Sequence, residues 1–135
     1  MTGMKAARNI VLVDDDPDDH EIFQIALKHA APSTRCSFYL SAKEALEELI
    51  RGKTPYPDYI FIDLNMPGMH GLQLLEELNG KTINPRVPIF IYSTSILPQE
   101  RKKAIELGAS RFFIKPTSHL DLIKLMSEIF KEYES

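Results

Sequence analysis

The segment NIVLVDDDPDDHEIF, residues 9–23, joins a short apolar run to a cluster of aspartates. Ile10–Val13 is rich in β-branched residues and stops at Asp14–Asp15, as expected of a short buried strand that ends in a polar loop. The pair Asp16–Pro17 is typical of a helix start, and apolar residues at helical spacing follow from Ile22. The segment therefore predicts a strand, an acidic loop and a helix in immediate succession.

The same unit of strand and helix recurs along the chain, and the pattern predicts five repeats. Alternation in Cys36–Leu40 indicates a half-exposed strand at a sheet edge. The other short apolar runs are Tyr59–Ile62, Ile89–Tyr92 and Phe112–Ile114. Amphipathic helical patterns lie between them, so the sequence predicts an α/β fold with a parallel sheet covered on both faces.

Composition narrows the class of protein. The chain has 135 residues, of which 44% are hydrophobic and 26% charged, so we expect residues 1–135 to form a single globular domain. The net charge is −3, so the chain lacks the excess of basic residues that is typical of nucleic-acid-binding proteins. No apolar stretch approaches the roughly 20 residues that cross a bilayer. The single cysteine, Cys36, favours a reducing compartment, and we expect a cytoplasmic location.

Polar residues stand where the predicted strands end. They are Asp14 and Asp15, Asp63, Ser93, and Lys115. Carboxyl ends of parallel strands meet at one edge of a sheet, which is where ligands bind in such folds. If the first and third strands are neighbours, three carboxylates converge there.

Converging carboxylates repel one another unless a cation lies between them. Oxygen ligands in an open site suit Mg²⁺, and the absence of CxxC or HExxH patterns argues against zinc. The four histidines are scattered, with no pair at metal-ligand spacing. A metal, a lysine and a hydroxyl beside a carboxylate suggest phosphoryl chemistry, in which the carboxylate can be the nucleophile.

Four motifs carry a family resemblance. VLVDDDPDD, IDLNMPGMHG, PIFIYSTS and FFIKP resemble, in this order and spacing, the motifs of response-regulator receiver domains. The match covers residues 9–133, nearly the whole chain. It implies a flavodoxin-like fold, a doubly wound five-stranded parallel sheet in the order 2-1-3-4-5 with five helices. It also implies a stand-alone response regulator in two-component signalling.

The resemblance implies a role for each polar residue of these motifs. Asp63 is the expected phosphoacceptor, and Lys115 is expected to hold a phosphoryl oxygen. The expected Mg²⁺ ligands are Asp14, Asp15, Asp63 and the backbone carbonyl of Asn65, with Asp14 acting through water.

The resemblance further implies a switch. Ser93 matches the switch hydroxyl, although Thr94 beside it is an alternative, and Phe112 matches the mobile aromatic residue. Lys115–Pro116 is expected to be a cis peptide bond. Gly71 matches the glycine that follows the active-site loop.

The implied partners are a sensor histidine kinase or phosphotransfer protein and a downstream protein. We expect no nucleic acid and no membrane partner. A homodimer through the face formed by the fourth helix, fifth strand and fifth helix is possible in this family. The domain is not expected to be an enzyme beyond catalysing its own phosphorylation and dephosphorylation.

Two alternatives compete with this interpretation. One is an aspartyl-phosphate phosphatase of the haloacid dehalogenase type, in which Asp14 and Asp16 would act, although Asp18 stands where that family has a hydroxyl residue. The other is a degenerate receiver that binds partners without phosphorylation. Loss of Asp63 or Lys115 would mark it, and the sequence has both.

Overall fold

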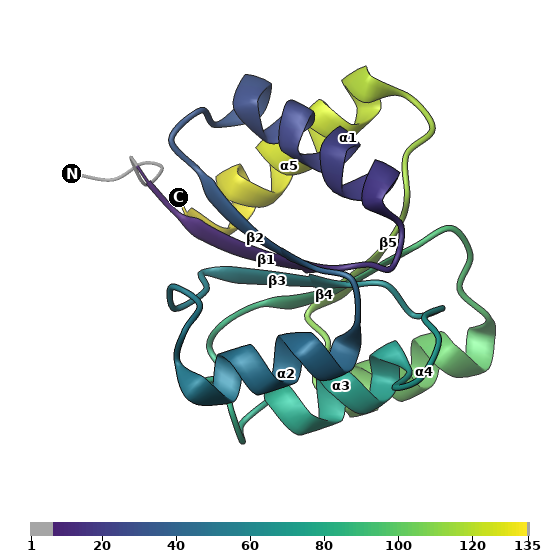
Figure 1. Ribbon diagram of the computed structural model, residues 1–135. Helices are drawn as coiled ribbons and strands as arrows, with labels where there is room; N and C mark the ends of the chain where they lie inside the picture. The colour runs from purple at the N-terminus through teal and green to yellow at the C-terminus, as the bar shows by residue number, and fades with distance from the viewer. Residues whose placement is uncertain (1–6, 135) are drawn as a thin grey trace.

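A computed structural model describes residues 7–134 of the chain. Both ends of the single domain predicted for residues 1–135 therefore lie outside the described residues. Strands and helices alternate throughout (Figure 1). Their bounds are β1 Asn9–Val13, α1 Pro17–Ala30, β2 Arg35–Tyr39, α2 Ala42–Arg51, β3 Tyr59–Ile62, α3 Gly71–Leu78, β4 Ile89–Ser93, α4 Pro98–Glu106, β5 Arg111–Ile114 and α5 His119–Glu134.

The strands form one parallel sheet in the order β2-β1-β3-β4-β5. This confirms the predicted doubly wound fold and its strand order. It also confirms that the segment around Cys36 is an edge strand. Because β1 and β3 are neighbours, with Val13 paired to Ile62, the residues that follow them come side by side.

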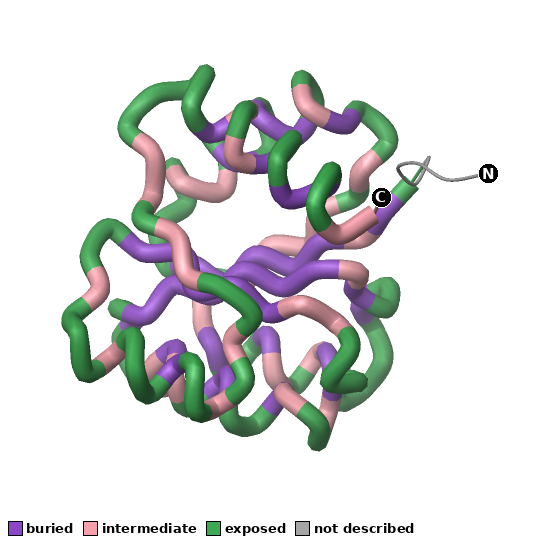
Figure 2. Tube along the Cα trace, turned by 180° about the vertical axis from the view of Figure 1, so that it is seen from behind, coloured by how far each residue is buried: buried purple, intermediate pink, exposed green. Residues whose placement is uncertain are grey.

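Helices cover both faces of the sheet. Helices α1 and α5 lie together on one face, and α2, α3 and α4 lie on the other (Figure 1). Alternate residues of β1 point to opposite faces of the sheet. Ile10 and Leu12 pack with α1 and α5, whereas Val11 and Val13 pack with the helices on the other face. The buried positions therefore run along the central strands and the inner sides of the helices (Figure 2).

Local signals fix where the helices begin and end. The Asp16 side chain accepts a hydrogen bond from the Asp18 amide at the start of α1, and Ser41 accepts one from the Glu44 amide at the start of α2. Gly52, with φ of 68°, closes α2 in the left-handed conformation that glycine adopts without strain. In the part of the chain that the structure describes, no helix has the length and apolarity to span a membrane.

Candidate functional site

Two neighbouring strand ends bring the three predicted acids together. Asp14 follows β1 and Asp63 follows β3, and the Asp63 amide donates to the Val13 carbonyl oxygen at 2.9 Å. Carboxylate oxygens of Asp14, Asp15 and Asp63 lie within 4.8 Å of one another. Among the described residues this is the only such grouping of three acidic, histidine or cysteine side chains.

The three acids differ in burial. Asp14 is fully buried and Asp63 is 6% exposed, whereas Asp15 faces solvent. An all-oxygen set with one exposed member fits a hard divalent cation that keeps several of its waters, as Mg²⁺ does. The donor chemistry of the site therefore fits Mg²⁺, with Asp14, Asp15 and Asp63 as the side chains that would hold it.

Lys115 lies between the acids. Its Nζ donates to Asp14 Oδ2 at 2.7 Å and to Asp19 Oδ2 at 2.8 Å, and lies 3.4 Å from Asp63 Oδ2. Burial alone would lower the pKa of this ammonium, but the hydrogen bonds to Asp14 and Asp19 outweigh burial and raise the pKa. Lys115 therefore stays charged and offsets the repulsion between the acids.

The buried carboxyl group of Asp14 titrates abnormally. Burial raises its pKa to about 6, against the lowering effects of Lys115 and of the Asp16 amide. That amide donates to Asp14 Oδ1 at 3.0 Å. A ring nitrogen of His20 lies 2.7 Å from the Asp14 carbonyl oxygen, so His20 hydrogen-bonds to the backbone of the loop that follows β1.

Ser93, the last residue of β4, completes the contacts around Asp63. Its hydroxyl donates to Asp63 Oδ1 at 2.9 Å, and the residue is fully buried. The Asn65 side-chain amide lies 3.4 Å from the same hydroxyl. Thr94 is exposed, so of the two hydroxyl residues considered from the sequence it is Ser93 that contacts Asp63.

A glycine allows the loop after β3 to close over Asp63. A Cβ atom on Gly71 would lie 2.4 Å from the Asp63 carbonyl oxygen and 2.9 Å from Leu64 Cα. Both neighbours are backbone atoms and cannot easily move aside. The first turn of α3 thus packs against the backbone of Asp63 only because residue 71 has no side chain.

Phe112 on β5 lies outside this cluster. Its ring is half-buried and packs against the layer formed by α2, α3 and α4. The Arg101 guanidinium on α4 lies 4.0 Å from the ring centroid, in cation–π geometry. The structure therefore links α4 to β5 at the position where the sequence predicts a mobile aromatic residue.

One sequence prediction at this site is wrong. No described peptide bond is cis, so Lys115–Pro116 is trans. An X–Pro bond prefers trans by about 0.5–1 kcal/mol unless the surroundings require otherwise. Here the trans bond already lets Lys115 Nζ reach the acids while the Lys115 amide donates to the Ser93 carbonyl oxygen at 2.8 Å.

Asp19 is a site residue that sequence reasoning missed. Asp18 and Asp19 follow the predicted helix start at Asp16–Pro17, where acids ordinarily cap a helix and interact favourably with its dipole. Asp16 and Asp18 do take part in the cap, but Asp19 binds the Lys115 ammonium. Asp19 lies in the first turn of α1, and its contact with Lys115 across 96 residues has no signal in the local sequence.

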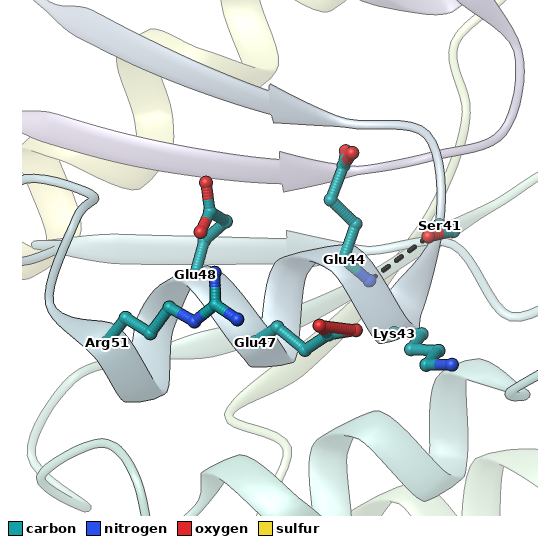
Figure 3. Close-up of a pocket in the computed structure, with 6 residues that line it drawn as sticks. All are labelled: Ser41, Lys43, Glu44, Glu47, Glu48 and Arg51. Atoms are coloured by element: carbon teal, nitrogen blue, oxygen red, sulfur yellow. Dashed lines mark hydrogen bonds between the residues drawn. The ribbon is translucent and has the colours of Figure 1, made fainter.

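A surface hollow lies away from this cluster, along α2 (Figure 3). Its volume is about 390 Å³, and its lining residues are Ser41, Lys43, Glu44, Glu47, Glu48 and Arg51. None of the predicted site residues is among them. The hollow is bordered by side chains spread along one helix, and the strand-end cluster remains the candidate site.

Sequence comparison supports the family resemblance. The family described as "Response regulator receiver domain" matches residues 10–127. Two-component response regulator ORR1 of Oryza sativa subsp. japonica is 30% identical over 132 residues, covering 93% of this chain and 56% of its own length. ORR6 of the same subspecies is 31% identical, covering 90% of this chain and 70% of its own length. The chain thus spans little more than half of ORR1.

Solved structures share the fold. The phosphorylated cyanobacterial phytochrome response regulator RcpA superposes with a TM-score of 0.79 at 23% identity, covering 94% of both chains. The Mn²⁺-bound form of response regulator Rcp1 gives a TM-score of 0.75 at 25% identity, covering 90% of this chain and 91% of its own.

Proposed function

Because this chain belongs to the response regulator receiver domain family of two-component signalling, we propose that its Asp63 carboxylate accepts a phosphoryl group from a phosphohistidine. The donor is a sensor histidine kinase or a phosphotransfer protein. The observation that carries the proposal is the pairing of a buried Asp63 with Ser93 Oγ at 2.9 Å and Lys115 Nζ at 3.4 Å, beside two further acids.

Each residue of the cluster has a part in this chemistry. An Asp63 oxygen forms a bond to phosphorus while the bond between phosphorus and the donor imidazole breaks, and the imidazole leaves with that electron pair. Lys115 and the Ser93 hydroxyl are placed to contact the phosphoryl oxygens once the group is on Asp63. Asp15, Asp63 and the Asn65 backbone carbonyl would hold Mg²⁺, with Asp14 acting through water, and the ion would offset negative charge on the transferring group.

Dephosphorylation returns the domain to its starting state. A water attacks phosphorus, the acyl phosphate bond breaks, and inorganic phosphate leaves the regenerated Asp63 carboxylate. Asn65 is exposed beside this carboxylate and Ser95 is exposed beyond Ser93, so neither side chain closes the approach to the site. In this proposal the domain catalyses its own phosphorylation and dephosphorylation and acts on no other substrate.

The proposed output is a change in the face formed by α4, β5 and α5. The Ser93 hydroxyl, already 2.9 Å from Asp63 Oδ1, turns to the phosphoryl group, and Phe112 turns inward, leaving Arg101. Helix α4 is suited to move because Ala104 is its one buried residue. Exposed Leu97, Ile105 and Ile114 offer apolar contacts there for a downstream protein or a second copy of the chain.

The phosphatase alternative fits the geometry less well. In that alternative Asp14 is the nucleophile, and the Asp16 side chain would have to reach the same site as a second acid. Instead, the Asp16 carboxylate accepts a hydrogen bond from the Asp18 amide at 2.9 Å and caps the start of α1. The cluster instead directs Ser93 and Lys115 toward Asp63. We place the phosphoryl exchange in the cytoplasm, the compartment that supplies ATP to a kinase.

The test is intact-mass spectrometry after incubation with acetyl phosphate. We expect a phosphoryl adduct on the wild type with Mg²⁺, and none with EDTA or in Asp63→Asn. A matched control is Asp58→Asn, which changes an acid one residue before β3 on the opposite edge of the sheet. An adduct that persists in Asp63→Asn would contradict the assignment.

A further inference from the structure

Two histidines that are far apart in the sequence lie side by side in the fold. His29 is in the last turn of α1, and His119 is the first residue of α5. The Nε2 atom of His119 lies 3.3 Å from the Nδ1 atom of His29. Their ring centroids are 5.1 Å apart and the ring planes meet at 81°. The sequence offered no histidine pair at metal-ligand spacing, but the packing of α1 beside α5 (Figure 1) creates one.

The distance between the two nitrogens suits a shared metal ion. Zinc binds histidine nitrogen at about 2.0–2.1 Å in tetrahedral geometry, which places two ligand nitrogens about 3.3–3.4 Å apart. The Nδ1 atom of His29 also lies 3.2 Å from the Ile25 carbonyl oxygen, and this contact is lost when Nδ1 gives up its proton to bind a metal. Both histidines are exposed, so water can hydrogen-bond that carbonyl oxygen instead and can also reach the bound ion.

We propose that His29 and His119 form a surface site for a divalent transition-metal ion of the zinc, nickel and copper class. Imidazole nitrogen is a preferred ligand for these ions, whereas Mg²⁺ prefers oxygen. In the described part of the chain, no third histidine, cysteine or acid joins the pair at ligand distance. Water therefore completes the coordination, and the site is open.

This site is chemically separate from the acidic cluster. One is a pair of nitrogens that joins α1 to α5, and the other is a set of oxygens at the strand ends. The histidines come together only when α1 and α5 are packed, so a bound ion stabilises the folded state. Zn²⁺ should accordingly raise the melting temperature of the wild type.

The test is a calorimetric titration with Zn²⁺ in the presence of saturating Mg²⁺, which occupies the acidic cluster. We expect one Zn²⁺ per wild-type chain. Loss of an outer-shell partner typically weakens metal binding by about 10–100-fold, so loss of a direct ligand in His29→Gln or His119→Gln should weaken it at least as much. The rise in melting temperature with Zn²⁺ should disappear in both variants.

The matched control is His70→Asn. His70 caps α3 by accepting the Leu72 amide through Nδ1, and asparagine is also a good N-cap residue, so this variant removes a histidine with little effect on the fold. It should bind Zn²⁺ as the wild type does. A second readout is NMR with Ni²⁺, which should broaden the ring resonances of His29 and His119 and leave those of His70 sharp.

Two results would overturn the proposal. One is the absence of saturable Zn²⁺ binding to folded wild-type protein in Mg²⁺. The other is binding of equal strength in the wild type and in both glutamine variants, which would place the ion elsewhere. Circular dichroism of each variant establishes that the comparison is made between folded proteins.

Discussion

At the scale of single residues, Lys115 has a structural part in addition to its proposed contact with phosphate. Its ammonium contacts three carboxylates, two of which, Asp14 and Asp63, belong to the acidic cluster. The side chain is 9% exposed, so these contacts are poorly screened by water. The lysine therefore supplies positive charge to two of the three acids that would hold a metal ion.

This arrangement predicts a large effect of Lys115→Ala on stability. Removal of one partner from a buried ion pair leaves the other charge buried without a counter-ion. We therefore expect a loss of about 3 kcal/mol in the free energy of unfolding at pH 8 in EDTA. Mg²⁺ should restore more stability to the variant than it adds to the wild type, because the lysine no longer repels it. Urea denaturation with and without Mg²⁺ measures both quantities.

The control for that experiment is Lys102→Ala, at an exposed position of α4. Its effect should stay within about 0.5 kcal/mol, as for surface substitutions in general. A loss in Lys115→Ala no greater than in Lys102→Ala would show that the lysine does not hold the acids.

The pKa of Asp14 predicts how metal binding depends on pH. Burial raises this pKa to about 6, and a proton on Asp14 competes with a metal ion for the same oxygens. The affinity for Mg²⁺ should therefore be constant above pH 7 and should fall as the pH drops below about 6. Titrations followed by calorimetry between pH 5 and pH 8 test this, and an affinity that is unchanged at pH 5 would contradict it.

The same pKa predicts the opposite trend for stability without metal. The folded protein takes up a proton on Asp14 near pH 6, whereas the unfolded chain does so near the ordinary value of 3.8. The contribution of Asp14 to the free energy of unfolding should thus rise as the pH falls from about 6 to about 4. Asp14→Asn should lack this contribution in EDTA.

At the scale of elements, the turn from β3 into α3 fixes the position of Asp63. Gly71 begins α3 in direct contact with the backbone of Asp63 and Leu64. We expect Gly71→Ala to lower the free energy of unfolding by about 1–3 kcal/mol through overpacking, and to slow phosphorylation because Asp63 must shift. Denaturation and the rate of reaction with acetyl phosphate are the measurements.

Gly52→Ala is the control, because it introduces backbone strain without displacing Asp63. Gly52 needs its left-handed φ of 68° but has open space around its Cα atom. Its alanine variant should lose stability by about 1–2 kcal/mol while the phosphorylation rate stays at the wild-type value. Equal rates in the Gly71 and Gly52 variants would argue against a positioning role for Gly71.

The elements also show what sequence could predict. Short apolar runs, caps and helical spacing predicted all five strands and helices, because these signals are local. The strand ends predicted the cluster of Asp14, Asp15 and Asp63, because parallel strands bring their carboxyl ends to one edge. These two inferences need only periodicity and topology.

What sequence missed depends on side-chain reach across elements. Asp19 binds Lys115, Arg101 stacks on Phe112, and His29 meets His119. The spacing of residues within one segment cannot predict such contacts, because each contact depends on how two separate segments pack together.

At the scale of the whole molecule, a buried ion pair ties the start of β1 to the end of α5. Arg8 donates to both Glu134 oxygens at 2.9 Å and 2.6 Å, and the Tyr59 hydroxyl donates to Oε2 at 2.5 Å. Both charged side chains are at most 5% exposed. These contacts lie at the edge of the sheet opposite the acidic cluster, so they stabilise the fold without entering the site.

We expect Glu134→Gln to lower the free energy of unfolding by about 3 kcal/mol, since it weakens a buried pair at one end. The exposed pair of Arg111 and Glu132, at 2.8 Å, provides the control. Glu132→Gln should change stability by no more than about 1 kcal/mol, as exposed pairs do. Similar losses in the two variants, measured by urea denaturation, would contradict the role given to burial.

The central claim is that Asp63, and no other acid of the cluster, carries the phosphoryl group. The most direct measurement is reduction of the phosphorylated protein with borohydride, which converts an aspartyl phosphate to homoserine, followed by tandem mass spectrometry of the peptides. The account predicts homoserine at residue 63, with Asp14 and Asp15 unmodified. Homoserine at residue 14 would contradict it and favour the phosphatase alternative, and a phosphorylated protein with no homoserine at any residue would exclude an acyl phosphate.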